Sequence, residues 1–191
     1  MEVASIKGVA LKLVADAIRE MLGSGRITRD ELEDELEKED LDLLDGEVVP
    51  GLWYPISSFA RLLTLALERD GQTKPEDWVR VGFEAGEKLL AGQAHQKVLS
   101  TAETWGDRSG FALVNLAPLL FNFSKWSFAS ESRSSRLFRV EVSEAREFPE
   151  VLRYMAQGVV EFLATRVQGR PVKVVSERPE PDLVVFRTDA G

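Results

Sequence analysis

The first 44 residues place hydrophobic side chains at the spacing of helices. From Ile6 to Leu22 they recur three and four positions apart, which predicts an amphipathic helix. Thr28 and Glu31 have the spacing of a capping box, so a second helix is expected over 28–44. This part of the chain is therefore predicted to be helical.

A turn and further helices are expected next. The segment Pro50 to Pro55 has a glycine and two prolines around Trp53 and Tyr54, which is typical of a rigid turn. A second capping box, Thr73 with Glu76, marks another helix start. The helices predicted after the turn cover 57–67, 73–90, 95–104 and 109–120.

The hydrophobic period changes from helical to alternating at Phe121. Alternating or short apolar runs, separated by polar and proline-rich turns, predict two β-hairpins around one further helix over 148–167. The predicted strands are 121–128, 137–142, 172–175 and 183–186.

This order of elements predicts the fold class. A helical N-terminal part is followed by strand, strand, helix, strand, strand, which favours an α+β fold with N-terminal helices packed on a C-terminal antiparallel sheet. We expect a single domain over 1–191, with 1–120 mainly helical and 121–188 forming the sheet with one helix.

Composition excludes several classes of function. The chain has 191 residues, 44% hydrophobic and 29% charged, as a globular protein does. Because it has no cysteine and one histidine, disulfides, thiolate metal sites and histidine clusters are excluded, and we expect no metal and no cofactor. The net charge of −8 argues against nucleic acid as a partner.

No targeting or membrane-spanning segment is visible in the sequence. The apolar stretch from Ile6 to Leu22 is interrupted by five charged residues, so it is neither a signal-peptide core nor a membrane helix. We therefore expect a cytoplasmic protein without membrane insertion. The acidic stretch over 28–44 lacks the calcium-loop pattern and is interpreted as a solvated helix face.

The residues for catalysis are sparse. A nucleophile relay would have to use His95, and no Gly-x-Ser-x-Gly elbow accompanies it. The paired carboxylates, such as Glu84 with Glu87, have ordinary solvent-face spacings. We therefore expect no enzyme activity and name no catalytic residue.

Aromatic residues are the candidates for ligand binding. Enough of them are present to line an apolar cavity, although aromatics at helical or strand spacing also form plain core. The candidates are Trp53, Tyr54, Trp78, Phe121, Phe123, Trp126 and Phe128. For Trp53 and Tyr54 we predict packing onto the core, with a loss of about 3 to 5 kcal/mol on truncating Trp53.

Two features of the sequence favour association. Gly82 and Gly86 lie one helical turn apart, a spacing that permits close helix approach, and the apolar side of residues 5–22 offers a second surface. A homodimer or a complex with another protein is the prediction. The alternative is that both faces are used inside the monomer.

The sequence resembles a known superfamily. Its ending, from Gly158 through the run at Gly169 to Asp182-Leu-Val-Val-Phe-Arg, resembles the close of the superfamily that joins the 4-vinyl reductase domain, the haem nitric-oxide-binding domain and the transport-particle subunits. Lys7-Gly8, Pro50 to Pro55, and Trp78 with Gly82 and Gly86 are similar to an uncharacterised myxobacterial family linked to it.

This resemblance implies a pocket between helices and sheet, filled by haem, by a lipid or by side chains. Haem members use a histidine ligand and a Tyr-x-Ser-x-Arg clamp for the propionates. Neither Tyr54 nor Tyr154 opens that motif, and His95 is the sole imidazole in the sequence. Haem is therefore the less favoured occupant.

Three functions from different classes remain. We favour a non-enzymatic signalling or adaptor domain that acts through dimerisation or protein binding. The alternative is a sensor that binds an apolar small molecule, lipid-like rather than haem, between helices and sheet. The third is an enzyme that uses none of the motifs considered above.

Overall fold

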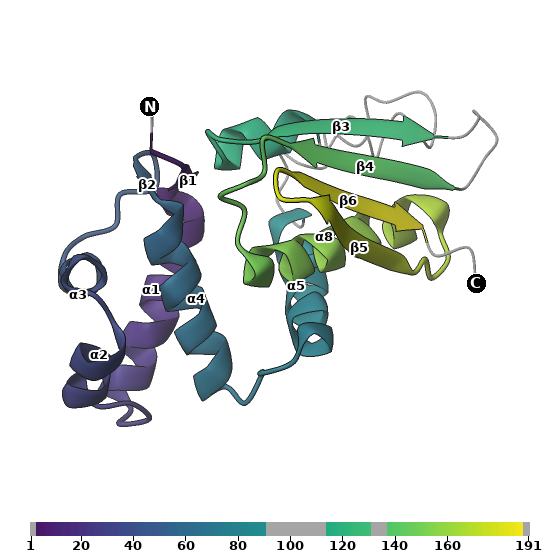
Figure 1. Ribbon diagram of the computed structural model, residues 1–191. Coiled ribbons are helices and arrows are strands. Elements are labelled where there is room, and N and C mark those ends of the chain that lie inside the picture. Colours follow the sequence, from purple (N-terminus) through teal and green to yellow (C-terminus); the bar gives the residue numbers. More distant parts are fainter. Residues whose placement is uncertain (1–2, 91–113, 131–136, 189–191) are drawn as a thin grey trace. The chain divides into compact units, whose positions relative to one another are not determined.

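The chain folds into two compact units. The computed structural model describes residues 3–90, 114–130 and 137–188. Unit 1 comprises Met1–Thr73 with Leu120–Asn122, and unit 2 comprises Lys74–Leu119 with Phe123–Gly191. Helices and antiparallel strands are both present, so the predicted α+β class is confirmed (Figure 1). That the whole chain makes a single domain stays a prediction.

Helices dominate unit 1. Their bounds are α1 Gly8–Gly23, α2 Arg29–Glu35, α3 Lys38–Asp45 and α4 Ile56–Arg69. The apolar stripes of α1 and α4 meet in a core that includes Leu11, Ile18 and Leu62, all at most 1% exposed. The helices predicted over 6–22 and 57–67 are thus present, each with slightly different ends.

The prediction of one continuous helix over 28–44 is wrong, because the structure has two helices there. Thr28 caps α2 with Glu31 as expected, but Leu36 is extended and α3 begins again after Glu37. The break has a local cause, because Glu37 and Asp40 form a second capping box within the acidic run.

Two short strands in unit 1 were not predicted. Strand β1 (Ser5–Lys7) pairs antiparallel with β2 (Trp53–Pro55), so that Ile6 lies opposite Tyr54. Phe121 forms a bridge to Ile6 on the other side of β1, and Asn122 accepts a hydrogen bond from the Ser5 N–H at 2.7 Å. Three residues are too few to show an alternating pattern in the sequence.

A four-stranded antiparallel sheet forms the centre of unit 2. Its strands are β3 Lys125–Ser130, β4 Phe138–Ser143, β5 Val174–Glu180 and β6 Leu183–Thr188, in the order β3-β4-β6-β5. Both predicted hairpins are therefore present in one sheet. The first strand begins at Lys125 rather than at Phe121, which bridges to β1 instead.

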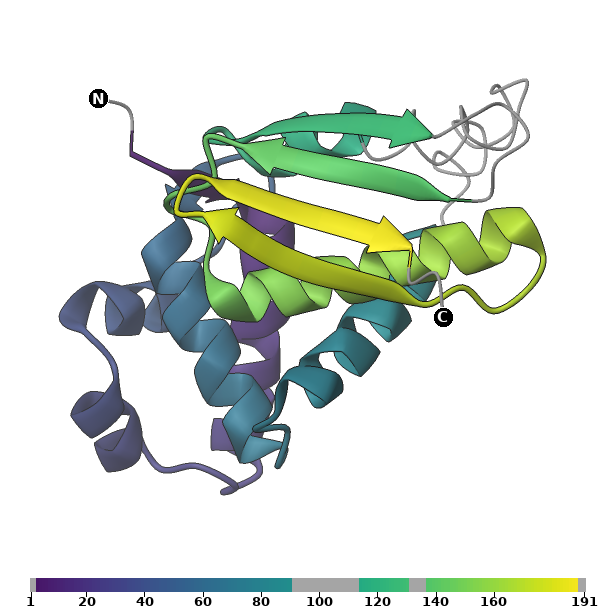
Figure 2. The same cartoon turned by 45° about the vertical axis from the view of Figure 1, so that its right-hand side comes forward.

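Two helices complete the layers of unit 2. Helix α8 (Glu150–Gln168) lies against the sheet, and α5 (Pro75–Leu90) packs along α8 (Figure 2). Gly169 ends α8 in the left-handed conformation, at φ 64°. Side chains that point from the sheet toward the helix side, such as Val140, Val142 and Phe186, are fully buried.

Parts of the predicted helices lie outside the described residues. Residues 114–120 are helical through Pro118, in agreement with the predicted helix over 109–120. The helix predicted over 95–104 and the turn over 130–136 lie wholly or mainly outside the described residues. Among the described helices, none is long and apolar enough to cross a membrane.

Candidate functional site

The aromatic residues predicted to line a ligand site lie in several elements. Trp53 and Tyr54 belong to β2, and Phe121 bridges to β1, all in unit 1. Trp78 lies on α5 in unit 2. Strand β3 contains Trp126 and Phe128, and Phe123 precedes it. All three join an aromatic cluster on the sheet. A ligand-lining role for the whole set stays a prediction.

The aromatic cluster of unit 2 lies on the inner face of the sheet. The Trp126 ring stacks on Phe186 and meets Phe148 edge-on, with both centroid distances at 6.0 Å. Phe128 stacks on Phe138 at 5.8 Å. Trp126 and Phe128 are themselves half-buried, so this face presents apolar, polarisable surface suited to a flat or aliphatic group.

Trp78 contributes to the contact between α5 and α8. Its ring lies 5.9 Å from that of Tyr154, and the Arg153 guanidinium lies 4.1 Å from the centre of the Tyr154 ring. These contacts hold Tyr154 in a cation–π arrangement between helices. In this position Trp78 packs helices together.

Three glycines bring α5 and α8 into close contact. A Cβ added at Gly82 would lie 2.0 Å from the Met155 carbonyl oxygen, and one at Gly158 would lie 2.0 Å from the Val79 carbonyl oxygen. At Gly86 the nearest atoms belong to the Phe162 ring, at 3.2 Å. The predicted close-approach face is thus used between two helices of the same chain, which is the alternative left open by the sequence.

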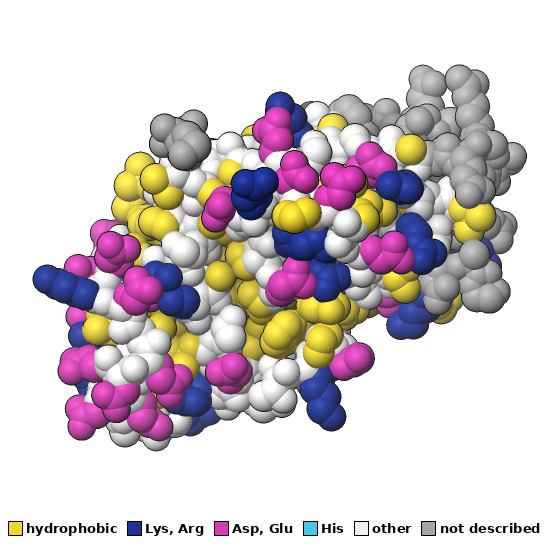
Figure 3. All heavy atoms as spheres, viewed as in Figure 1, with side chains coloured by type: hydrophobic (Ala, Val, Ile, Leu, Met, Phe, Trp, Pro, Cys, Tyr) yellow, Lys and Arg dark blue, Asp and Glu magenta, His cyan; other side chains and the backbone are white. Residues whose placement is uncertain are grey.

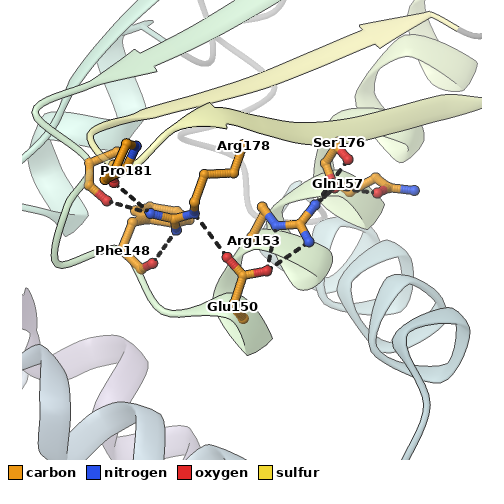
Figure 4. Close-up of polar contacts among 8 residues, drawn as sticks. Phe148, Glu150, Arg153, Gln157, Ser176, Arg178 and Pro181 are labelled. Atoms are coloured by element: carbon orange, nitrogen blue, oxygen red, sulfur yellow. Dashed lines mark hydrogen bonds and ion pairs between the residues drawn. The ribbon is translucent and has the colours of Figure 1, made fainter.

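A ladder of polar side chains joins α8 to β5. Arg153 donates to the carbonyl and hydroxyl oxygens of Ser176 at 2.9 and 2.8 Å (Figure 4). Gln157 donates to the Val174 carbonyl at 2.8 Å. Glu161 accepts from the Val174 N–H at 3.1 Å. Arg153, Gln157 and Glu161 are four residues apart, so they share one side of the helix.

This ladder protects an edge of the sheet. Strand β5 is an edge strand, and the polar groups of Val174 and Ser176 that face away from β6 are bonded to α8 side chains. Unpaired edge groups otherwise recruit a strand from another chain. The ladder is therefore a structural device that covers the edge of β5 at Val174 and Ser176.

Arg178 ties the end of the sheet to the loop before α8. Its guanidinium donates to the carbonyl oxygens of Ala145, Phe148 and Pro181, and to Glu150 at 2.9 Å (Figure 4). A planar fork of five donors suits several acceptors at fixed angles. Arg178 thus holds both the β4–α8 loop and the β5–β6 turn.

We expect Arg178→Lys to destabilise unit 2 by about 1–3 kcal/mol, because an ammonium group cannot reach three carbonyls in different directions. Thermal or urea unfolding measures the change. Arg139→Lys is the matched control, since Arg139 is an exposed arginine on the outer face of the same sheet that pairs with Glu141. Equal stability of the two variants would contradict the structural role.

An open depression of about 530 Å³ lies beside Arg178. Its lining residues are Arg146, Phe148, Glu150, Arg178, Pro179, Glu180 and Pro181. Because the guanidinium of Arg178 is bonded to protein acceptors, the depression has no prepared anion site at that group.

A turn in unit 1 holds the start of α1. The N–H groups of Gly8 and Val9 donate to the carbonyl oxygens of Leu52 and Pro50, at 2.9 and 3.0 Å. A Cβ on Gly8 would lie 2.2 Å from the Val49 carbonyl oxygen, so only glycine fits there. Tyr54 accepts from the Val49 N–H at 2.8 Å, as a rigid turn requires.

The predicted burial of Trp53 is wrong. Its side chain is 40% exposed, with the Lys7 ammonium 3.9 Å from the ring centre. Successive residues of a strand point to opposite sides, so when Tyr54 faces inward Trp53 faces outward. The predicted loss of 3 to 5 kcal/mol on truncating Trp53 therefore does not apply to this exposed position.

Salt bridges join the acidic helices to their surroundings. The side chain of Asp40, which is fully buried, accepts from the Arg61 guanidinium at 2.6 and 2.9 Å. Arg29 pairs with Asp45 at 2.6 Å on the surface. The acidic stretch thus forms a solvated face, as expected, with one buried carboxylate.

Several carboxyl groups of unit 1 have a lowered pKa. For Asp45 the main cause is the hydrogen bond from Arg29, for Glu31 it is the backbone hydrogen bond from Thr28, and for Asp16 it is the hydrogen bond from Lys12. The charged, deprotonated form of each group is therefore more stable in the folded state than in the unfolded chain.

Unit 1 should therefore lose stability in acid. A carboxyl group with a lowered folded pKa stabilises the fold fully above its unfolded value, and this contribution disappears as the pH falls through the folded value. We expect unfolding midpoints in urea to be constant above about pH 5 and to fall below about pH 4. Midpoints that rise on acidification would contradict these shifts.

The described residues offer no evident metal site. Groups of three or more histidine, aspartate or glutamate side chains able to hold an ion are absent from them. His95, the one imidazole in the sequence, lies outside the described residues. The expectation that the chain is not an enzyme stays a prediction.

The ladder from α8 was not predicted. Its signal was present, because Arg153, Gln157 and Glu161 form one polar stripe on a helix that is otherwise largely apolar. Nothing in the sequence identified β5 as the partner of this stripe.

The comparisons with known proteins identify the fold. No family model and no curated protein matches the chain. Among solved structures, the unliganded Fe(II) H-NOX protein from K. algicida matches with a TM-score of 0.64 and 10% identity, covering 96% of this chain and 95% of that one. The Fe(II)NO form of an H-NOX protein from S. oneidensis gives 0.59 and 13%, over 96% and 98%. The chain therefore has an H-NOX-like fold, in agreement with the resemblance found in the sequence.

The described residues do not fit the haem of these neighbours. The Tyr54 hydroxyl accepts a hydrogen bond from the Val49 N–H within its turn, and the Tyr154 ring is covered by the Arg153 guanidinium. Arg153 and Arg178 are bonded to protein acceptors. The whole sequence has no cysteine and no Tyr-x-Ser-x-Arg motif. Haem chemistry is therefore not assigned to this site.

Proposed function

We propose that the chain is a non-enzymatic signalling or adaptor domain of H-NOX-like fold that acts by binding a protein and not through haem. One observation carries this proposal: the fold extends over 96% of the chain, whereas the sequence lacks the Tyr-x-Ser-x-Arg motif with which haem members of the resembled superfamily hold the propionates. A cytoplasmic location belongs to the same proposal.

The absorbance spectrum of the purified chain tests the haem-free part. The protein is produced with added haem precursor, and its spectrum is compared with that of the His95→Ala variant. We expect no Soret band from either protein. A stoichiometric Soret band in the parent that is lost or shifted in the variant would overturn the proposal, because His95 would then ligate iron.

A second candidate is a sensor for an apolar small molecule. The aromatic cluster favours it, since the half-buried rings of Trp126 and Phe128, backed by the buried Phe148 and Phe186, provide apolar contact area on one face. Native mass spectrometry of the purified chain tests this candidate. An added mass of a few hundred daltons that is lost in Trp126→Ala would favour the sensor over the adaptor.

Association also stays a prediction. A homodimer held by apolar contacts should persist or tighten as salt rises, whereas a complex with a basic partner should weaken. Sedimentation of the purified chain at two salt concentrations separates these cases. A single monomeric species under both conditions would exclude the homodimer and leave a protein partner.

A further inference from the structure

Unit 1 carries a cluster of exposed hydrophobic side chains. Seven large hydrophobic side chains are exposed among the described residues, and five of them belong to α1 and the turn that holds it. We call these five residues the turn–helix patch: Val9, Leu13, Val49, Leu52 and Trp53, each at least 40% exposed. In Figure 3 hydrophobic side chains gather at the upper left, in the region where Figure 1 draws β1 and β2.

The patch is built on fixed backbone. Leu13 follows Val9 by one helical turn, so both lie on one side of α1. The Val9 N–H donates to the Pro50 carbonyl oxygen, and Lys7 donates from its ammonium to the Gly51 carbonyl oxygen at 2.9 Å. These bonds place the turn beside α1, so little order would have to be gained on binding.

Negative charge predominates in the unit that carries the patch. Unit 1 contains sixteen acidic and eight basic side chains, so it carries the whole net charge of −8, and unit 2 is neutral. On α1 the stripe that begins with Val9 and Leu13 continues through Asp16 and Glu20. Glu47 precedes Val49 by two residues, and like Glu20 it is exposed and has no ion pair among the described residues.

The lysines beside the patch are already engaged. Lys7 lies over the Trp53 ring and bonds to Gly51, and Lys12 pairs with Asp16 at 2.8 Å. They offset part of the local charge. The Arg19 guanidinium, which pairs with Asp16, also donates to the Gly46 carbonyl oxygen beside Glu47 at 2.7 Å, but neither Glu20 nor Glu47 forms an ion pair among the described residues. A partner that binds along this side of α1 would contact the apolar side chains of Val9 and Leu13 at its start and the carboxylate of Glu20 near its end.

We propose that the turn–helix patch binds an amphipathic, basic segment of a partner protein. Such a segment would place apolar side chains on Val9, Leu13 and Leu52 and lysine or arginine near Glu20 and Glu47. A second copy of this chain is disfavoured, because it would bring another unit of net charge −8 against this one. The inference rests on the proposed protein-binding function and names its surface and partner chemistry.

Defined peptides test the patch on the full chain. A dye-labelled helical peptide of leucine and lysine, with leucines three and four apart, is titrated with the protein, and anisotropy reports binding. The control peptide has glutamate in place of lysine. Leu13→Ser combined with Leu52→Ser removes the patch, and Leu119→Ser is the matched control, a leucine 62% exposed in unit 2. Melting curves check that both variants remain folded.

We expect the basic peptide to bind the parent and the Leu119→Ser variant equally, and the patch variant at least about tenfold more weakly. Added salt should weaken binding, and less so after Glu20→Gln with Glu47→Gln. The acidic peptide should not bind.

Two results would overturn the inference. Equal binding of the basic peptide by all variants would mean general attraction to an acidic protein. A dimer of the parent that dissociates on removal of the patch would make a second copy the occupant. A Soret band would instead contradict the proposed haem-free function without changing the peptide result. Failure of the proposed function and failure of this inference are therefore distinguishable.

Discussion

Gly158→Ala is expected to destabilise unit 2 by about 3 kcal/mol or more, at the upper end of the cost of overpacking a core. The added Cβ would lie 2.0 Å from the Val79 carbonyl oxygen and 2.5 Å from the Phe83 nitrogen. Because both atoms belong to the backbone of α5, the clash cannot be relieved by turning a side chain. The helices would have to separate along their contact.

Two other glycines serve as controls for this effect. At Gly86 the nearest atoms belong to the Phe162 side chain, at 3.2 Å or more, and small shifts can relieve the contact, so Gly86→Ala should cost clearly less. Gly23 has nothing within 4 Å of an added Cβ, and Gly23→Ala should stabilise α1 by roughly 0.5–1 kcal/mol. Urea unfolding of the three variants gives the order. If Gly158→Ala were as stable as the parent, the close helix contact would be wrong.

The elements of this fold were largely predictable because most are long enough to show their period. Helix α8 repeats its apolar positions over nineteen residues, and the strands of both hairpins pair as expected. Strands β1 and β2 span three residues each, and their pairing depends on tertiary contacts. The break at Leu36 was missed for another reason. The capping box that follows it consists of Glu37 and Asp40, and acidic residues occur throughout this stretch, so the box does not stand out.

The candidate site was less predictable than the fold. Sequence spacing showed that Gly82 and Gly86 permit a close helix contact, but it could not show whether the neighbour belongs to the same chain. Trp53 and Tyr54 were grouped because they are adjacent, whereas strand geometry turns them to opposite sides. The exposure of Leu13 and Leu52 depends on which elements cover them, and the local pattern does not contain that information.

Asp40→Ala should destabilise unit 1 by about 3 kcal/mol, near the lower end of the cost of breaking a buried ion pair. Its carboxylate is fully buried, bonds Arg61 of α4 at 2.6 and 2.9 Å, and accepts from the Glu37 N–H at the start of α3. Removing it leaves Arg61 with Glu37, at 3.3 Å, and with partial access to water. That remaining solvation keeps the loss below the largest values known for such pairs.

A double-mutant cycle separates the ion pair from the helix cap. Arg61→Met removes the guanidinium and leaves Asp40 to cap α3, whereas Asp40→Asn keeps the shape and removes the charge. If the pair carries most of the effect, the double variant Asp40→Asn with Arg61→Met should be nearly as stable as Asp40→Asn alone. Asp45→Asn, in the exposed pair with Arg29, should change the unfolding midpoint far less. Strict additivity of the Asp40 and Arg61 variants would show that the two side chains act independently, and the predicted coupling between α3 and α4 would be wrong.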